Sequence, residues 1–227
     1  MPKTISVAID GPAAAGKSTV AKRVAAILNF TYIDTGAMYR AFTWAVMERG
    51  LDPEDEKASC SIIPEVTIDL LEDGRVICCG QDVTRAIREP LVSGNVSYIA
   101  SYKDIRLALV DMQRAMAQSK SVVMDGRDIG TYVLPDADVK IYQIASVETR
   151  AKRRYDENVS KGIPTSMEDV IADVRKRDYI DSHRAFAPLK PAEDSVPLDT
   201  SDLNIEEVVD AILNIIHDKT GLEIPCH

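Results

Sequence analysis

Eight consecutive residues near the start of the chain constrain its fold more than any other feature. They read Gly-Pro-Ala-Ala-Ala-Gly-Lys-Ser over residues 11–18, match the pattern G-x-x-x-x-G-K-[ST], and follow an apolar run at 5–9. Residues 17–28 then carry apolar side chains at helical spacing. In such a strand–loop–helix unit, backbone N–H groups and the helix N-terminus surround a phosphate group. The residues expected to bind a nucleoside triphosphate are Gly11, Pro12, Ala13, Ala14, Ala15, Gly16, Lys17, Ser18 and Thr19.

The same motif predicts the chemistry of two side chains. In loops of this kind the lysine reaches the β- and γ-phosphates, and the hydroxyl binds Mg²⁺. Lys17 is therefore expected to be catalytic and Ser18 to be a metal ligand. Asp125, which ends the apolar run at 122–124, is the second metal candidate, because an acidic residue there would orient the waters of the ion.

Strand-like runs alternate with helical patterns along most of the chain. The runs lie at 5–9, 31–33, 122–124, 139–144 and 196–198. This alternation predicts an α/β protein with a parallel sheet, here a three-layer fold of the P-loop NTPase type. Ligands bind beyond the carboxyl ends of such strands. Gly11, the pair Asp34 and Thr35, and residues 125–128 all follow predicted strands.

Two segments depart from this alternation. Apolar runs at 66–70 and 75–79 flank an Asp73-Gly74 turn, which predicts a β-hairpin, and a third short strand is expected at 81–83. Residues 149–155 carry several basic side chains before a Lys-Gly-Ile-Pro break at 161–164. A helical lid over a triphosphate and a solvated charged face are both compatible with that run. We expect a core domain (1–58, 95–148 and 170–227), a β-rich insert (59–94) and a lid (149–169).

Composition narrows the possible partners and compartment. The 227 residues carry a formal charge of −9 and have a pI near 4.9, which argues against binding to nucleic acid or a membrane surface. The four cysteines, Cys60, Cys78, Cys79 and Cys226, lack the spacing of metal ligands. A lead of only Met-Pro-Lys before the first strand leaves no room for a signal peptide. These features predict a cytoplasmic protein, which we expect to be a monomer.

Four motifs in a fixed order resemble those of bacterial cytidylate kinases. They are the loop in its D-G-P-x-x-x-G-K form, D-T-G-A-M-Y-R at 34–40, D-G-R-D-I-G-T at 125–131, and R-D-Y-I-D-S-H-R at 177–184 followed by Pro-Leu at 188–189. The resemblance covers nearly the whole chain, and in that family the β-rich insert belongs to the monophosphate-binding region. It implies transfer of the ATP γ-phosphoryl group to CMP or dCMP. Mg²⁺ is the expected cofactor.

The resemblance also implies roles for individual residues. Arg40, Arg127 and Arg184 would hold the CMP phosphate. Lys17, Arg127 and the lid arginines Arg150, Arg153 and Arg154 would neutralise charge on the transferred group. The full set expected to bind CMP is Thr35, Arg40, Ser97, Arg106, Arg127, Asp128, Arg177, Asp181 and Arg184.

Within that set, Asp128 and Arg106, assisted by Ser97, would read cytosine, and Arg177 and Asp181 would contact the ribose. Residues 177, 181 and 184 share one helix face, an arrangement that a purely structural salt-bridged stripe would also produce. Asp128 likewise has an alternative role as a structural ion-pair partner. Thr35 stands where the family often has serine, which keeps the hydroxyl.

Two other functions are compatible with the phosphate loop alone. A related kinase could act on UMP, thymidylate or a non-nucleotide such as shikimate, although those enzymes are not expected to combine the insert with D-G-R-D. A non-catalytic nucleotide switch would need a guanine-reading N-K-x-D motif, which this sequence lacks. The motifs together favour the kinase that uses a cytidine nucleotide.

Overall fold

A computed structural model describes residues 4–225 of the chain. By its internal contacts the chain divides into two units. The first contains the described residues up to Tyr32 together with those from Ser119 onward, and the second runs from Ile33 to Gln118. Cys226 lies outside the described residues, and Cys60, Cys78 and Cys79 are free thiols.

A five-stranded sheet organises the first unit. Its order is β2-β6-β1-β7-β8, and β1 pairs in parallel with both β6 and β7, as β7 does with β8. The predicted α/β class with a parallel sheet is therefore confirmed. The strands span Ser6–Asp10 (β1), Thr31–Asp34 (β2), Val122–Gly126 (β6), Val139–Ile144 (β7) and Val196–Asp199 (β8).

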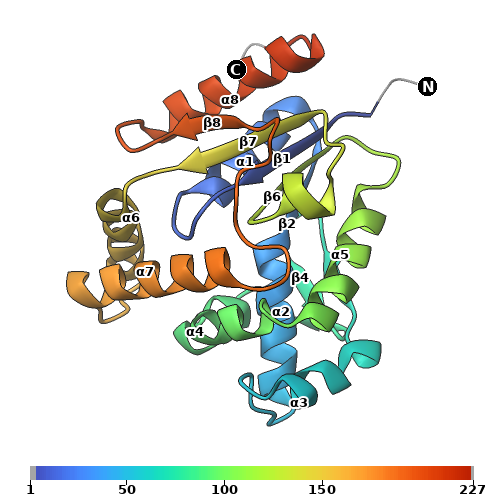
Figure 1. Ribbon diagram of the computed structural model, residues 1–227, viewed down its shortest axis with the longest axis vertical. Helices are drawn as coiled ribbons and strands as arrows, with labels where there is room; N and C mark the ends of the chain where they lie inside the picture. Colours follow the sequence, from blue (N-terminus) through green and yellow to red (C-terminus); the bar gives the residue numbers. More distant parts are fainter. Residues whose placement is uncertain (1–3, 226–227) are drawn as a thin grey trace. The chain divides into compact units, whose positions relative to one another are not determined.

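Helices α1 (Lys17–Leu28) and α8 (Ile205–Thr220) pack on each other and against one face of this sheet (Figure 1). Alternate strand residues such as Val7 and Ile9 point toward them, because successive side chains of a strand face opposite ways. The helix predicted over 17–28 is confirmed. A capping box begins α8, in which Asn204 and Glu207 each bind the backbone N–H of the other.

The remaining helices of the first unit follow β6 and β7. A short π-helical turn, η3 (Ile129–Val133), comes directly after β6, and α6 (Val147–Ser160) follows β7. Helix α7 (Met167–His183) packs alongside α6. The predicted break is present, since α6 ends at Ser160 and Gly162 has φ 69°. No helix in residues 4–225 combines the length and the apolar character needed to cross a membrane.

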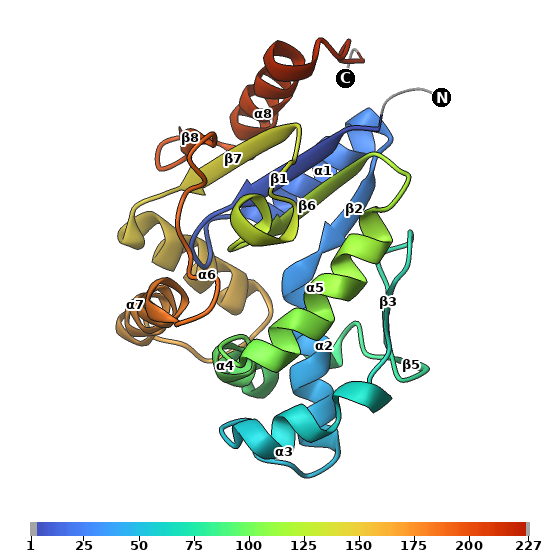
Figure 2. The same ribbon diagram turned by 45° about the vertical axis from the view of Figure 1, so that its right-hand side comes forward.

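The second unit is mainly helical and carries a small antiparallel sheet (Figure 2). Its core gathers Met38, Phe42, Ile87 and Leu109 around α2. The predicted hairpin is confirmed, because β3 pairs with β4 across the Asp73-Gly74 turn. The elements are α2 (Thr35–Glu48), α3 (Glu56–Ser61), η1 (Ile63–Glu65), β3 (Ile68–Leu70), β4 (Val76–Cys78), β5 (Gln81–Asp82), η2 (Ala86–Arg88), α4 (Pro90–Ile99) and α5 (Lys103–Ala117).

The predicted insert, 59–94, falls within this second unit. The third predicted strand is present as β5, one residue shorter than expected. Its functional boundaries, like those of the lid at 149–169, remain a prediction.

Candidate active site

The glycine-rich loop connects β1 to α1, as the sequence predicts. Gly11 has φ 154°, and a Cβ atom there would lie 2.0 Å from the backbone oxygen of Gln143, so only glycine fits. Gly16 is the N-cap of α1 with φ 87°. Ser18 and Thr19 are exposed in the first turn of α1. Backbone N–H groups at a helix N-terminus attract anions, so this loop has the features of a phosphate site.

Lys17 is buried and folds back on its own loop. Its Nζ donates to the carbonyl of Pro12 at 2.8 Å. Burial and the neighbouring Arg127 lower the pKa of Lys17 to about 7, against the opposing effect of Asp125 and Asp10. Lys17 and Arg127 thus repel each other, and a bound anion would relieve that repulsion.

Ser18 and Asp125, the two residues predicted to hold the metal, are hydrogen-bonded to each other. The Ser18 hydroxyl donates to Oδ2 of the buried Asp125 at 2.8 Å, and the hydroxyl of Tyr32 donates to the other carboxylate oxygen, also at 2.8 Å. Among residues 4–225, no three His, Cys, Asp or Glu side chains gather into a metal site. Mg²⁺ in nucleotide enzymes takes few protein ligands, with waters and phosphate oxygens completing its shell. One hydroxyl beside one carboxylate therefore fits this ion.

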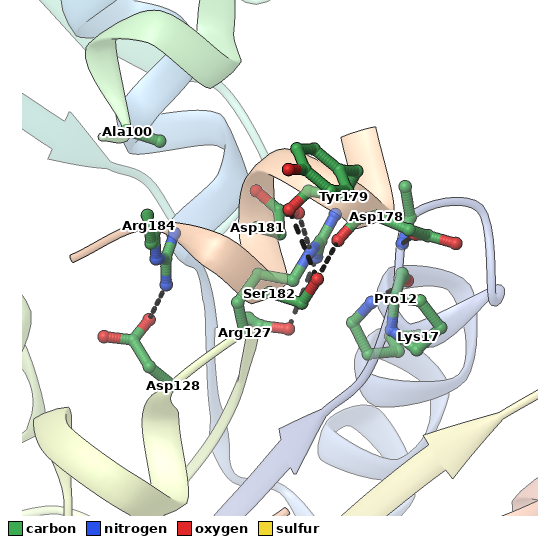
Figure 3. A network of polar contacts seen from close by, with 12 residues as sticks. Pro12, Lys17, Ala100, Arg127, Asp128, Asp178, Tyr179, Asp181, Ser182 and Arg184 are labelled. Atoms are coloured by element: carbon green, nitrogen blue, oxygen red, sulfur yellow. Dashed lines mark hydrogen bonds and ion pairs between the residues drawn. The ribbon is translucent and has the colours of Figure 1, made fainter. Parts of the chain in front are cut away.

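Two ion pairs involve the residues that follow β6, one buried (Arg184 with Asp128) and one partly buried (Arg127 with Asp181) (Figure 3). Arg127 Nε donates to Asp181 at 2.8 Å, and Arg184 Nη2 lies 3.3 Å from Asp128. Burial alone would raise the pKa of Asp181, but Arg127 and Arg184 hold it below its usual value. The structure thus brings together two arginines and two carboxylates predicted to bind CMP.

Arg177 lies one helical turn before Asp181 on α7. Burial, Arg127 and Arg154 together lower its pKa to about 10. Within the part of the chain that the structure describes, its Nε has no hydrogen-bond partner. A guanidinium held in this state has capacity for a further acceptor.

The three predicted lid arginines occupy different surroundings. Arg150 is buried, and its Nη1 donates to the carbonyl of Ala13 at 3.0 Å. Arg153 donates to the carbonyl of Ala15 at 3.1 Å. Arg154 is only partly exposed and pairs with Glu157 on its own helix at 3.3 Å. The first two arginines therefore bind the phosphate loop itself.

Four predicted CMP ligands belong to the second unit. Thr35 begins α2, where Asp34 caps the helix and also pairs with Arg40 at 3.4 Å. Arg106 is fully buried on α5, with its guanidinium carbon 5.3 Å from the ring centroid of Tyr39. Ser97 is buried on α4.

Sequence reasoning gave no role to three side chains that shape this site. Asp10 accepts the backbone N–H groups of Ile129 and Gly130 at 2.8 and 2.7 Å. Asp178 and Gln143 contact the phosphate loop. Asp10 could have been predicted, because it is the last residue of β1, directly before the loop, and a buried acid there needs donors. Asp178 lies within the motif at 177–184 but was given no role, and no sequence pattern marks Gln143.

A phosphate loop on a parallel sheet, followed by converging arginines, defines the class of P-loop kinases. Solved structures agree on the fold: an uncharacterized protein from Eubacterium ventriosum aligns with TM-score 0.53 at 16% identity, covering 95% of this chain and 99% of its own. A gluconokinase from Sinorhizobium meliloti aligns with TM-score 0.50 at 12% identity, covering 96% and 94%.

Sequence comparison gives the family. A family model described as cytidylate kinase matches residues 7–218. A cytidylate kinase of Anoxybacillus flavithermus is 52% identical over 96% of this chain and 99% of its own length. One from Bacillus subtilis is 48% identical over 97% and 100%. The chain belongs to the cytidylate kinase family.

Proposed function

We propose that this protein transfers the γ-phosphoryl group of ATP to CMP or dCMP, giving ADP and the nucleoside diphosphate. The observation that supports this most directly is that Arg127 and Arg184 form ion pairs with Asp181 and Asp128 at 2.8 and 3.3 Å. Burial and, after it, the charge of Arg127 lower the pKa of Lys17, in agreement with this grouping of cations. The acceptor phosphate is itself the nucleophile, so the protein mainly has to position two polyanions and stabilise their charge. Converging cations are what this reaction needs.

The cations divide by the group they would serve. Lys17 would bind the β- and γ-phosphates, and Arg40, Arg127 and Arg184 would bind the phosphate of CMP, for which the planar guanidinium is well shaped. Asp181 and Asp128 now neutralise two of these arginines. When substrate phosphate replaces that charge, the carboxylates become available to other donors.

Base recognition would use a carboxylate beside an arginine. Cytosine presents an exocyclic amine next to the N3 acceptor, whereas uracil reverses this order, so Asp128 and Arg106, with Ser97, would favour cytosine. Arg177 and Asp181 would contact the ribose, and Thr35 the nucleotide. One carboxylate facing a 2′-hydroxyl discriminates only partly, so dCMP is expected to react too.

Ser18 and Asp125 would hold Mg²⁺, the first as a direct ligand and the second through the ion's waters. When bound, the ion would neutralise charge on the β- and γ-phosphates. The residues at 149–169 would act as a lid that excludes water from the reaction. The acidic composition argues against binding to nucleic acid and favours a monomer through charge repulsion. The free thiols of Cys60, Cys78 and Cys79 suit a reducing compartment, which we take to be the cytoplasm.

A coupled assay of ADP release tests this function. ATP and Mg²⁺ would be supplied with CMP, dCMP, UMP, AMP or shikimate as acceptor. We expect the highest kcat/KM with CMP or dCMP. A higher value with any other acceptor, or ATP hydrolysis that is independent of an acceptor, would contradict the proposal.

Asp128→Ala is expected to lower kcat/KM for CMP more than kcat/KM for UMP. Loss of the carboxylate removes the acceptor for the cytosine amine, and a lost polar contact of this kind costs about ten- to a hundredfold in kcat/KM. The measurement is kcat/KM for both acceptors in wild type and variant. Equal losses of kcat/KM for CMP and UMP would show that Asp128 does not recognise the base and acts only through its ion pair with Arg184. Asp136→Ala, an exposed acid a few residues further along, is the control.

ATP binding is expected to take up a proton near neutral pH. The pKa of Lys17 is about 7 in the free protein, and the triphosphate raises it by favouring the ammonium form. At pH 8, where free Lys17 is mostly neutral, binding should take up about one proton. Affinity for ATP should then fall as pH rises above 7.

Calorimetric titration in two buffers of different ionisation enthalpy measures this uptake. Lys17→Arg is the control, because arginine stays protonated throughout this range. Equal heats in both buffers for the wild type at pH 8 would show that Lys17 does not titrate on binding.

A further inference from the structure

The backbone N–H and carbonyl of Ala13, in the middle of the phosphate loop, are both bound by side chains of α6 and α7. Its N–H donates to Oδ1 of Asp178 on α7 at 3.3 Å, and its carbonyl accepts from Nη1 of Arg150 on α6 at 3.0 Å. The same Nη1 pairs with Oδ2 of Asp178 at 2.7 Å. Figure 3 shows Asp178 beside the loop that carries Pro12 and Lys17. One ion pair thus binds both polar groups that flank Ala13.

The carbonyl of Ala15 is fixed in a similar way. Nε2 of Gln143 donates to it at 2.7 Å, and Arg153 donates at 3.1 Å. Gln143 is 1% exposed and comes from β7, directly beneath the loop. Its Oε1 makes no hydrogen bond to any residue between 4 and 225. A buried amide oxygen without a hydrogen bond destabilises the fold. We therefore take the hydrogen bond from Nε2 to the Ala15 carbonyl as the contact that compensates for it.

Between these two anchored residues lies Ala14, whose backbone has φ 57°. Residues with a Cβ atom avoid this left-handed region, at a cost of about 1–2 kcal/mol. Such strain persists only where surrounding contacts fix the backbone, and it concentrates at functional sites. The contacts to Ala13 and Ala15 supply that constraint on either side of Ala14.

We propose that Asp178, Arg150 and Gln143 are positioning residues, which hold the phosphate loop in the strained shape that accepts ATP. The proposal rests on the proposed function only in taking ATP as the ligand of the loop. It distinguishes the lid arginines. Nε and Nη1 of Arg150 bind Ala13, Ala145 and Asp178, so Arg150 acts through the loop. Among residues 4–225 Arg154 pairs with Glu157 of its own helix and not with the loop, so a direct role at the transferred phosphate is left to it rather than to Arg150.

Asp178→Asn tests the proposal, because asparagine keeps the size of the side chain but loses the ion pair to Arg150. We expect ATP affinity, measured by calorimetry, to fall about tenfold, while CMP affinity stays within twofold and the midpoint of thermal unfolding moves by a few degrees at most. Asp173→Asn, which removes the same charge from an exposed position on α7, is the matched control. Unchanged ATP affinity, or a parallel loss of ATP and CMP affinity, would overturn the proposal.

A second substitution, at Ala14, separates a positioning role of Asp178 from a purely structural one. Only a positioning role predicts that it restores ATP affinity. Glycine adopts φ near 57° without strain, so Ala14→Gly in the Asp178→Asn background should recover several-fold in ATP affinity. No recovery would overturn the proposal.

Gln143→Met is the independent variant should Asp178→Asn fold poorly. Methionine fills the same space and removes the unused Oε1, so the fold should tolerate it. ATP affinity should again fall while CMP affinity is kept, and an unchanged ATP affinity would count against the proposal. Since ATP binding is the readout, a wild type that bound ATP but phosphorylated no CMP would refute the proposed function and leave this test intact.

Discussion

Lys17→Ala is expected to lower kcat by about a thousandfold or more, the scale on which a single charged donor contributes to phosphoryl transfer. Lys17 is buried at the end of the loop, and its Nζ donates to the carbonyl of Pro12. Lys17 is the first residue of α1, at the helix N-terminus proposed to bind the triphosphate. CMP binding should be largely kept, because the residues proposed to bind CMP lie in other segments.

Two controls separate this effect from general damage. Lys22→Ala removes an exposed lysine from the same helix and should leave kcat unchanged. Lys17→Arg keeps a charge in the wrong geometry, so its kcat should lie between wild type and Lys17→Ala. A Lys17→Ala variant with near-normal turnover would contradict the assignment of this loop as the ATP site. Turnover is read by ADP release, and CMP affinity by calorimetry.

Asp10→Ala is expected to destabilise the fold by about 2–4 kcal/mol at pH 5, because two buried backbone N–H groups lose their acceptor. Those groups belong to Ile129 and Gly130, at the start of the turn that follows Asp128. The same change should raise the KM for CMP, since the turn that positions Asp128 loosens. Chemical denaturation at several pH values measures the stability term.

The effect of Asp10 should depend on pH with a definite sign. Burial raises the pKa of Asp10 from 3.8 to about 6, so the folded state holds more protons than the unfolded state between these values. The stability that this group contributes is therefore present below pH 4 and is lost as pH rises through 6. The destabilisation by Asp10→Ala should be about 1 kcal/mol larger at pH 5 than at pH 7.

Asp138→Ala is the matched control for this variant. Its carboxylate also accepts two bonds, from the backbone N–H and the hydroxyl of Ser6, but it is only partly buried, so water can replace it. We expect a smaller loss of stability and no change in the KM for CMP. An Asp10→Ala variant no less stable than Asp138→Ala would show that the turn does not need this acceptor.

Local elements of this fold were predictable with good accuracy. The apolar spacing after the loop predicts a helix over 17–28, which is the observed α1. The Asp73-Gly74 turn predicts the pairing of β3 with β4. These features follow from neighbours a few residues apart, where backbone preference and side-chain periodicity dominate.

Pairings across the chain were less accessible. The motifs indicated that Arg127, Asp128, Asp181 and Arg184 serve one site, but which carboxylate binds which arginine came only from the structure. The resemblance implied one shared role for Arg150, Arg153 and Arg154, and only the structure shows that Arg150 binds the carbonyl of Ala13. The pattern of charges along a sequence shows which residues can form ion pairs. It does not show which partner each residue has in the folded protein.

By itself, the sequence determined the phosphate loop, the parallel α/β class and the resemblance to cytidylate kinases, because each depends on residue type at short spacing. Tertiary structure alone decided that Asp10 caps the turn after β6 and that Asp178 and Gln143 hold the loop. These contacts join residues 119, 165 and 128 positions apart. Hydrogen-bond partners at such separations depend on how the helices and strands pack against one another. The periodicity of residue types along the chain reports local structure only, so it cannot predict these partners.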